Sequence, residues 1–132
     1  MPVWISVDVV RAIHAEVLTE HGGLPGRPRA GALEAALARP QNLLGYGNHQ
    51  PSLSTLASSY EFGLARGHCF PDGNKRVALS TLDVFLQLNG YELTAGDTPA
   101  TVDTFRALAA GQLSEEQLAE WISANSQPLP PD

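Results

Sequence analysis

The chain has 132 residues, 43% of them hydrophobic, and a formal net charge of −6, so one globular domain with its own core is expected. The negative charge argues against direct nucleic-acid binding, which depends on cations that meet phosphates. Apolar stretches fall short of the roughly 20 residues that cross a bilayer, so no membrane span is expected either.

The cysteine content and the first residues indicate where the protein works. Cys69 is the only cysteine, so no intrachain disulfide can form, which fits a reducing compartment. Residues 1–14 lack the basic start, the long apolar run and the small-residue cleavage site of a signal peptide. We therefore expect a cytoplasmic protein.

Two helices are predicted in the first third of the chain. Ser6 is a candidate N-cap for a helix that has apolar residues at helical spacing and stops at Gly22-Gly23. Residues 30–39 are rich in Ala and Leu, and we expect a short helix there that ends at Pro40.

A loop and a third helix are expected next. Residues 40–52 contain two prolines and two glycines and show no periodicity, which predicts a loop. Apolar residues between 53 and 65 follow the i, i+3, i+4, i+7 spacing of a helix, and Gly67 is expected to end it.

Three more helices complete the predicted all-α fold. Residues 74–89 are apolar around most of a helical circumference, which is typical of a buried central helix. A fifth helix is expected from Thr98-Pro99 to Gly111, because proline is favoured in a first turn. Residues 114–124 begin with a capping-box pattern and predict the last helix.

Two short segments are expected outside the helices. Residues 91–93 have the composition of a short strand. Residues 126–132 read SQPLPPD, which predicts a frayed tail. We therefore expect a single domain in residues 1–125 followed by a flexible C-terminal tail in residues 126–132.

A short basic segment lies inside this acidic chain. Residues 64–76 carry three cations and one acid, a net charge of +2, whereas residues 77–132 carry one cation and eight acids, a net charge of −7. The basic segment also contains Lys75, the only lysine. This pattern suits a local anion site better than an extended track for a polyanion.

The segment GHCFPDGNKR, residues 67–76, lies between two predicted helices within that basic region. The first turn of a helix has unpaired N–H groups and the positive end of the helix dipole, so it binds anions naturally. Gly73 lets the backbone approach a ligand closely. Lys75 and Arg76 lie on the same first turn and can hold phosphate oxygens.

His68 and Asp72 add acid–base and metal chemistry to this turn. His68 has an abundant neutral form near pH 7, as a general base requires. Asp72 can cap the helix or hold a Mg²⁺ ion that bridges phosphates. Structural roles are the alternative for single residues, because Asp72 and Asn74 are ordinary capping residues and Phe70 is expected to anchor the loop in the core. Together the group is typical of phosphoryl or nucleotidyl transfer.

HCFPDGNKR resembles the signature of the Fic/Doc superfamily, which runs His-x-Phe-x-Asp/Glu/Asn-Gly/Ala-Asn-x-Arg. Other segments resemble the death-on-curing (Doc) branch of this superfamily across about residues 5–122, namely HGGLPG at 21–26, ARGH at 65–68 and LNG at 88–90. The resemblance implies a Fic-like helical bundle with a central buried helix after the motif loop.

The residue at position 75 separates two activities within the superfamily. Fic enzymes that transfer AMP to a hydroxyl have Gly at the position of Lys75 and a second Arg at the position of Leu79. In the death-on-curing branch the Lys accompanies a reversed ATP pose that presents the γ-phosphate. The resemblance therefore implies a protein Ser/Thr kinase that uses ATP and Mg²⁺.

The resemblance also assigns roles to the residues of the motif. His68 is expected to take the proton from the target hydroxyl. Asp72 is expected to orient ATP or the acceptor through a Mg²⁺ ion that it coordinates. Phosphate binding and stabilisation of the developing charge fall to the first turn of the following helix. The expected catalytic residues are His68, Asp72, Lys75 and Arg76. The expected ATP- or phosphate-binding residues are Gly73, Asn74, Lys75, Arg76 and Ser80.

The death-on-curing resemblance implies protein partners as well. It implies a toxin that phosphorylates a threonine on elongation factor Tu and stops translation. No Ser/Thr-x-x-x-Glu-Gly/Asn inhibitory motif occurs in the chain, so inhibition is expected from a separate, Phd-like antitoxin. The predicted loop 40–52 lies where the superfamily often carries a flap that docks the target.

Three other functions stay open at this point. The first is transfer of AMP to a protein hydroxyl, and the second is a catalytically inactive module that binds an antitoxin. The third is a metal-dependent nuclease that uses His68 and Asp72, which the charge of the chain disfavours.

Overall fold

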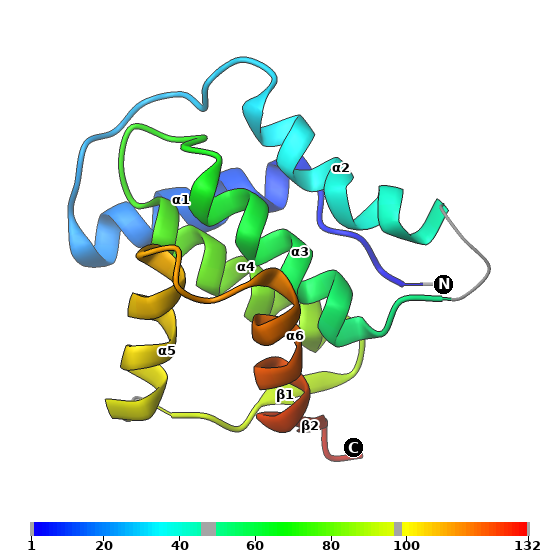
Figure 1. Ribbon diagram of the computed structural model, residues 1–132. Helices are drawn as coiled ribbons and strands as arrows, with labels where there is room; N and C mark the ends of the chain where they lie inside the picture. Colours follow the sequence, from blue (N-terminus) through cyan, green and yellow to red (C-terminus); the bar gives the residue numbers. More distant parts are fainter. Residues whose placement is uncertain (1, 46–49, 97–98, 132) are drawn as a thin grey trace.

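The computed structural model describes residues 2–45, 50–96 and 99–131, and these residues form a helical bundle with one short two-stranded sheet (Figure 1). The elements in chain order are α1 (Val7–His21), α2 (Ala32–Gly45), α3 (Leu53–Arg66), α4 (Asn74–Leu88), β1 (Tyr91–Leu93), α5 (Pro99–Ala109), α6 (Glu115–Ala124) and β2 (Ser126–Pro128). The predicted all-α class is confirmed. Within the described segments, none of the helices has the length and apolarity needed to span a bilayer.

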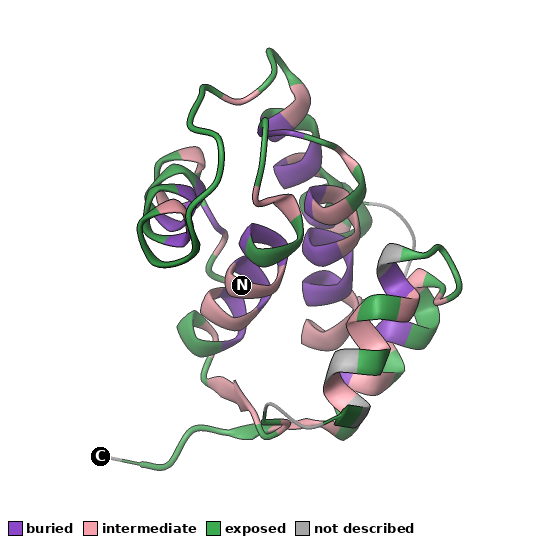
Figure 2. Cartoon of the chain, turned by 90° about the vertical axis from the view of Figure 1, so that its left-hand side faces the viewer, coloured by how far each residue is buried: buried purple, intermediate pink, exposed green. Residues whose placement is uncertain are grey.

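α3 lies at the centre of the bundle and packs against α2, α4 and α6 (Figure 1). α4 packs along α3 and also against α1, and its buried side faces inward (Figure 2). Tyr60 on α3 and Phe85 on α4 are fully buried, with ring centroids 4.9 Å apart. The expected buried helix after the motif loop is therefore present, and α3 is the more enclosed of the two helices.

The predicted end of the second helix at Pro40 is wrong, because α2 continues through this proline to Gly45. A proline in a helix interior removes one backbone hydrogen bond and clashes with the preceding turn. Pro40 is nevertheless buried on the same side of α2 as Leu33 and Leu37, so tertiary packing offsets the local cost. Of the predicted loop 40–52, the first six residues are helical, and residues 46–49 lie outside the described part of the chain.

The prediction of a frayed tail is wrong for residues 126–128, which form β2. This strand pairs antiparallel with β1, whose position was predicted correctly, and Leu93 lies opposite Ser126. Pro128 obscured the strand in the sequence, since proline donates no hydrogen bond to a ladder and occurs mainly on edge strands. In a two-stranded sheet each strand is an edge, so the proline is tolerated.

Tyr60 joins the N-terminal segment to the central helix, and its loss is expected to weaken the fold. Its hydroxyl oxygen accepts a hydrogen bond of 3.1 Å from the buried Ile5 N–H. We expect Tyr60→Phe to lower the free energy of unfolding by about 1–3 kcal/mol, because the Ile5 N–H stays buried without its partner. Urea denaturation followed by circular dichroism measures the change. The control Tyr91→Phe, at a partly buried tyrosine, should change the free energy of unfolding by less than about 0.5 kcal/mol. Equal losses in both variants would contradict the role of this hydrogen bond.

Candidate active site

The motif loop begins where α3 ends. Gly67 caps α3, and its N–H donates to the Gly63 carbonyl at 2.9 Å. His68 follows with a φ of +47°, a left-handed conformation that no other non-glycine residue adopts within the described residues. This conformation costs roughly 1–2 kcal/mol for a residue with a Cβ, so neighbouring contacts must maintain it.

Arg29 holds the backbone on both sides of His68. Its guanidinium donates to the Gly67 carbonyl at 2.6 Å, and its backbone N–H donates to the Cys69 carbonyl at 2.6 Å. Cys69 and Phe70, which follow His68 in the chain, are both buried. The burial of Phe70 confirms it as the anchor of the loop. The exposed His68 side chain is therefore held in a fixed place between two tied backbone groups.

Phe70 is fastened by α1 on one side and by α4 on the other. The buried His14 of α1 stacks on it, with ring centroids 3.9 Å apart, and the His14 Nε2 lies 3.2 Å from the Asp72 carbonyl oxygen. The Asn74 side chain accepts a hydrogen bond from the Phe70 N–H and donates one to the Phe70 carbonyl, both at 2.9 Å. The Asn74 side-chain amide therefore closes the loop. Only the backbone N–H of Asn74 remains for the predicted phosphate contact.

Asp72 ties the motif loop to the segment before α2. Its Oδ1 accepts a hydrogen bond from the Gly73 N–H at 2.9 Å, and its Oδ2 accepts one from the Leu24 N–H at 3.1 Å. Gly73 is the N-cap of α4 at a φ of +82°, and no side chain caps this helix. Asp72 therefore does not cap α4, and the first-turn N–H groups of α4 have no side-chain partner to compete with an anion.

Two glycines allow this close approach between segments. A Cβ at Gly23 would lie 2.9 Å from the Asp72 Oδ2, and a Cβ at Gly26 would lie 2.7 Å from the Pro71 Cγ. A side chain at either position would collide with the motif loop, so one of the two would have to shift. Residues 23–26 of the HGGLPG segment are therefore part of the support of the site.

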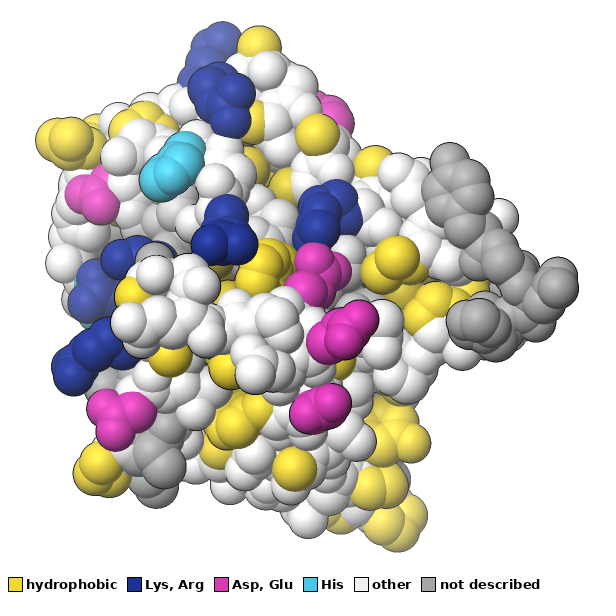
Figure 3. Space-filling model, viewed as in Figure 1, with side chains coloured by type: hydrophobic (Ala, Val, Ile, Leu, Met, Phe, Trp, Pro, Cys, Tyr) yellow, Lys and Arg dark blue, Asp and Glu magenta, His cyan; other side chains and the backbone are white. Residues whose placement is uncertain are grey.

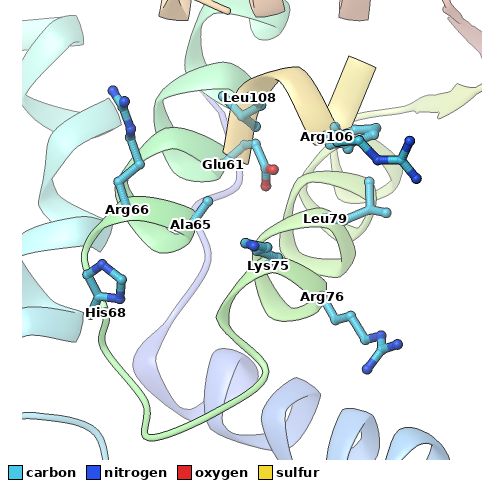
Figure 4. Close-up of a pocket in the computed structure, with 10 residues that line it drawn as sticks. Glu61, Ala65, Arg66, His68, Lys75, Arg76, Leu79, Arg106 and Leu108 are labelled. Carbon is cyan, nitrogen blue, oxygen red and sulfur yellow. The ribbon is translucent and has the colours of Figure 1, made fainter. Parts of the chain in front are cut away.

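A pocket of about 850 Å³ lies between the C-terminal part of α3, the start of α4 and the C-terminal part of α5 (Figure 4). Three of the predicted residues line it, namely His68, Lys75 and Arg76. Its remaining lining consists of two further arginines, one glutamate and four apolar residues that the sequence argument did not assign to the site. These are Arg66, Arg106, Glu61, Ala65, Leu79, Phe105 and Leu108.

The pocket is basic, and its cations are largely without acidic partners. Arg66, Lys75 and Arg76 form no ion pair within 4.0 Å in the part of the chain that the structure describes. Arg106 has only an exposed contact of 3.9 Å with Asp103, and such pairs are weak. On the face shown in Figure 3, several Lys and Arg side chains lie at the edge beside α5, others lie at the centre and top of the face, and acidic side chains lie over α6. Cations that are not neutralised attract a ligand with several negative charges.

Four of the predicted residues lie outside the pocket lining. Asp72, Gly73 and Asn74 shape the loop and the start of α4 but contribute no lining. Ser80, one turn beyond Arg76, lines two neighbouring hollows together with Asp83. A carboxylate beside a hydroxyl disfavours phosphate, so the expected phosphate contact of Ser80 finds no support in its position.

Glu61 is the most unusual residue in the pocket lining. Its side chain is 1% exposed, and its Oε2 has no hydrogen-bond partner among the described residues. Burial raises the pKa of Glu61 to about 8. A sequence signal existed, since Glu61 lies four residues after Ala57 and therefore on the apolar side of the predicted helix.

These features define a helical protein with a helix–loop–helix motif whose basic residues and histidine line one pocket. Residues 4–86 match the family model of the Fic/DOC family, and the chain belongs to this family. It is 34% identical over 118 residues to "Protein kinase doc" of Escherichia phage P1, which covers 89% of this chain and 91% of that protein. It is also 42% identical over 65 residues to "Toxin Doc" of Mycolicibacterium smegmatis, covering 49% of this chain and 50% of that protein. The resemblance to the death-on-curing branch is confirmed.

The raised pKa of Glu61 predicts how stability depends on pH. Between its usual value of 4.5 and about 8, the folded state keeps a proton that the unfolded state releases. The free energy of unfolding should therefore fall as pH rises through this window. We expect Glu61→Gln to flatten the dependence and to exceed the wild-type stability at pH 8.5 by on the order of 2–4 kcal/mol. Urea unfolding at pH 5.5, 7 and 8.5 measures this, and parallel curves for both proteins would contradict it.

Proposed function

We propose that the protein is the toxin of a toxin–antitoxin pair and a kinase that transfers the ATP γ-phosphate to a threonine of elongation factor Tu, which blocks translation. The observation that carries the proposal is the arrangement of His68, Lys75 and Arg76 around one basic pocket. Support comes from the identity to a phage relative named as a protein kinase and a mycobacterial relative named as a toxin. The choice of target rests on the resemblance to the death-on-curing branch.

The residues of the pocket divide the chemistry between them. His68 takes the proton of the threonine hydroxyl, whose oxygen then attacks the γ-phosphorus. The bond from that phosphorus to the β,γ-bridging oxygen breaks, and ADP leaves with the bonding electrons. Lys75, Arg76 and the first-turn N–H groups of α4 hold the phosphates and stabilise the charge that develops on them.

We propose that Mg²⁺ binds together with the phosphates, held by Asp72 beside the pocket lining. In the described segments, no three His, Cys, Asp or Glu side chains converge to hold a metal. Each oxygen of the exposed Asp72 carboxylate accepts one N–H and keeps a second lone pair. Mg²⁺ is commonly held by one or two carboxylates together with substrate phosphates, so Asp72 would hold it here. When bound, the ion neutralises charge on the phosphates.

A separate antitoxin of the Phd-like kind completes the proposal. The chain has no internal inhibitory motif of the type that the superfamily uses. An acidic or amphipathic segment that folds over the unpaired cations of the pocket would block ATP from the site. The reaction would then take place in the cytoplasm, with no direct nucleic-acid or membrane partner.

Removal of His68 tests the proposed base. His68→Ala should lower transfer of γ-labelled phosphate by at least about 100-fold, because general base catalysis contributes that much or more. The control His21→Ala, at an exposed histidine at the end of α1, should leave transfer unchanged. Label from the γ-position of ATP, and none from the α-position, marks a kinase. Undiminished transfer by a folded His68→Ala protein would remove this residue from the mechanism.

Replacement of Lys75 tests which residue determines the orientation of bound ATP. Lys75→Gly, which restores the residue of the AMP-transferring enzymes, should lower γ-phosphate transfer at least tenfold, since one phosphate-binding cation is lost. Incorporation of α-label in this variant would show that the ATP pose has reversed. Unchanged γ-labelling would show that Lys75 does not determine the pose.

A further inference from the structure

The pocket has two chemically different ends. Its exposed end carries the cations Arg66, Lys75, Arg76 and Arg106 together with His68. Its more enclosed part consists of buried or partly buried apolar side chains and a single carboxyl group, that of Glu61. Figure 4 shows the Glu61 carboxyl extending from α3 into the space between α3 and α4. A ligand with an anionic tail and an uncharged, polar-edged ring would match both ends.

Given the proposed use of ATP, on which this step rests, we infer that the Glu61 carboxyl is the hydrogen-bonding anchor for the adenine ring. The side chain is 1% exposed, lines the pocket, and has an oxygen without a partner among the described residues. Buried polar groups are nearly always paired, so an unpaired one that faces a pocket indicates a ligand group.

The protonation state of Glu61 makes the inference specific to adenine. A neutral carboxyl offers one donor and one acceptor side by side, and the adenine edge offers an amino donor beside a ring nitrogen acceptor. An ionised carboxylate only accepts, so it can form just one of these two bonds. The ionised form instead suits guanine, which presents two donors on one edge. Burial keeps Glu61 largely neutral at pH 7, since it raises the pKa to about 8.

The surroundings of Glu61 favour a flat ring over a sugar. Ala65, Leu79, Phe105 and Leu108 line the same pocket, and such surfaces pack against an aromatic ring, whereas ribose hydroxyls would lack partners there. Glu61 precedes the end of α3 by five residues, roughly 7.5 Å along the helix axis. Arg66 at this end of the helix is thus about one and a half helical turns from Glu61.

Nucleotide preference at two pH values tests this inference. Isothermal titration calorimetry would measure the binding of ATP and of GTP to wild type, Glu61→Gln, Glu61→Leu and the control Ser59→Ala at pH 7 and pH 9. Ser59 is equally buried on α3, its hydroxyl is also without a partner among the described residues, and it does not line the pocket. Both nucleotides carry the same triphosphate.

The ratio of the two affinities therefore cancels effects from the other titratable and charged groups of the pocket. These are Arg66 of α3, His68 of the loop, Lys75 and Arg76 of α4, and Arg106 of α5. Only a group that contacts the base changes the ratio.

We expect the ATP-to-GTP affinity ratio of wild type to fall at least about tenfold from pH 7 to pH 9, because only about a tenth of Glu61 stays neutral one unit above its pKa of about 8 and the ionised form favours guanine. The amide of Glu61→Gln keeps one donor and one acceptor. This variant should therefore bind ATP at both pH values with the affinity that the wild type has at pH 7, and its ATP-to-GTP ratio should not fall. Glu61→Leu should weaken ATP at least tenfold at pH 7, since the adenine edge loses both bonds. Ser59→Ala should match the wild type throughout.

The outcomes separate this inference from the function on which it rests. Wild-type protein that transfers γ-phosphate, with a ratio unaffected by pH and by Glu61→Leu, would overturn the role of Glu61 and leave the kinase proposal intact. Wild-type protein that binds neither nucleotide and transfers no label would overturn both.

Discussion

Docking of residues 22–29 onto the motif loop is the constraint on which the site depends. Arg29 ties the carbonyls on both sides of His68, and Asp72 reaches back to the Leu24 N–H. These bonds maintain a left-handed histidine that would otherwise relax. They also fix the turn between α3 and α4. This turn brings Arg66 at the end of α3 into the same pocket as Lys75 and Arg76 at the start of α4.

Local signals were enough to predict most of the helices, because caps and apolar spacing act within a few residues. The capping box at Ser114 and Gln117 forms as predicted, and Ser6 caps α1. The two errors arose where contacts distant in sequence outweigh local preference. Burial against α3 carries α2 through Pro40, and pairing with β1 turns residues 126–128 into a strand. Neither partner could be inferred from the segment itself.

The site was predictable to the extent that its residues are neighbours in the chain. His68, Lys75 and Arg76 meet in one pocket because a single tight turn separates them. The direction in which a side chain points was not predictable in the same way. Asn74 and Asp72 use their polar groups on the loop, since their hydrogen-bond partners come from the backbone around them. Residues contributed by other helical turns, such as Arg106 and Glu61, had no motif to mark them.

Glu61 also has a consequence for the charge of the pocket. A carboxylate there would cancel part of the field of Lys75 and the arginines, and would weaken the attraction for a triphosphate. Because burial holds its pKa at about 8, the residue contributes hydrogen-bonding capacity at neutral pH with little negative charge. The unpaired Glu61 oxygen lowers the free energy of unfolding, since an apolar residue of similar size would fill the same space without it. The pocket thus combines a neutral polar group, Glu61, with several cations. This combination is compatible with a nucleotide whose base contacts Glu61 and whose phosphates contact the cations.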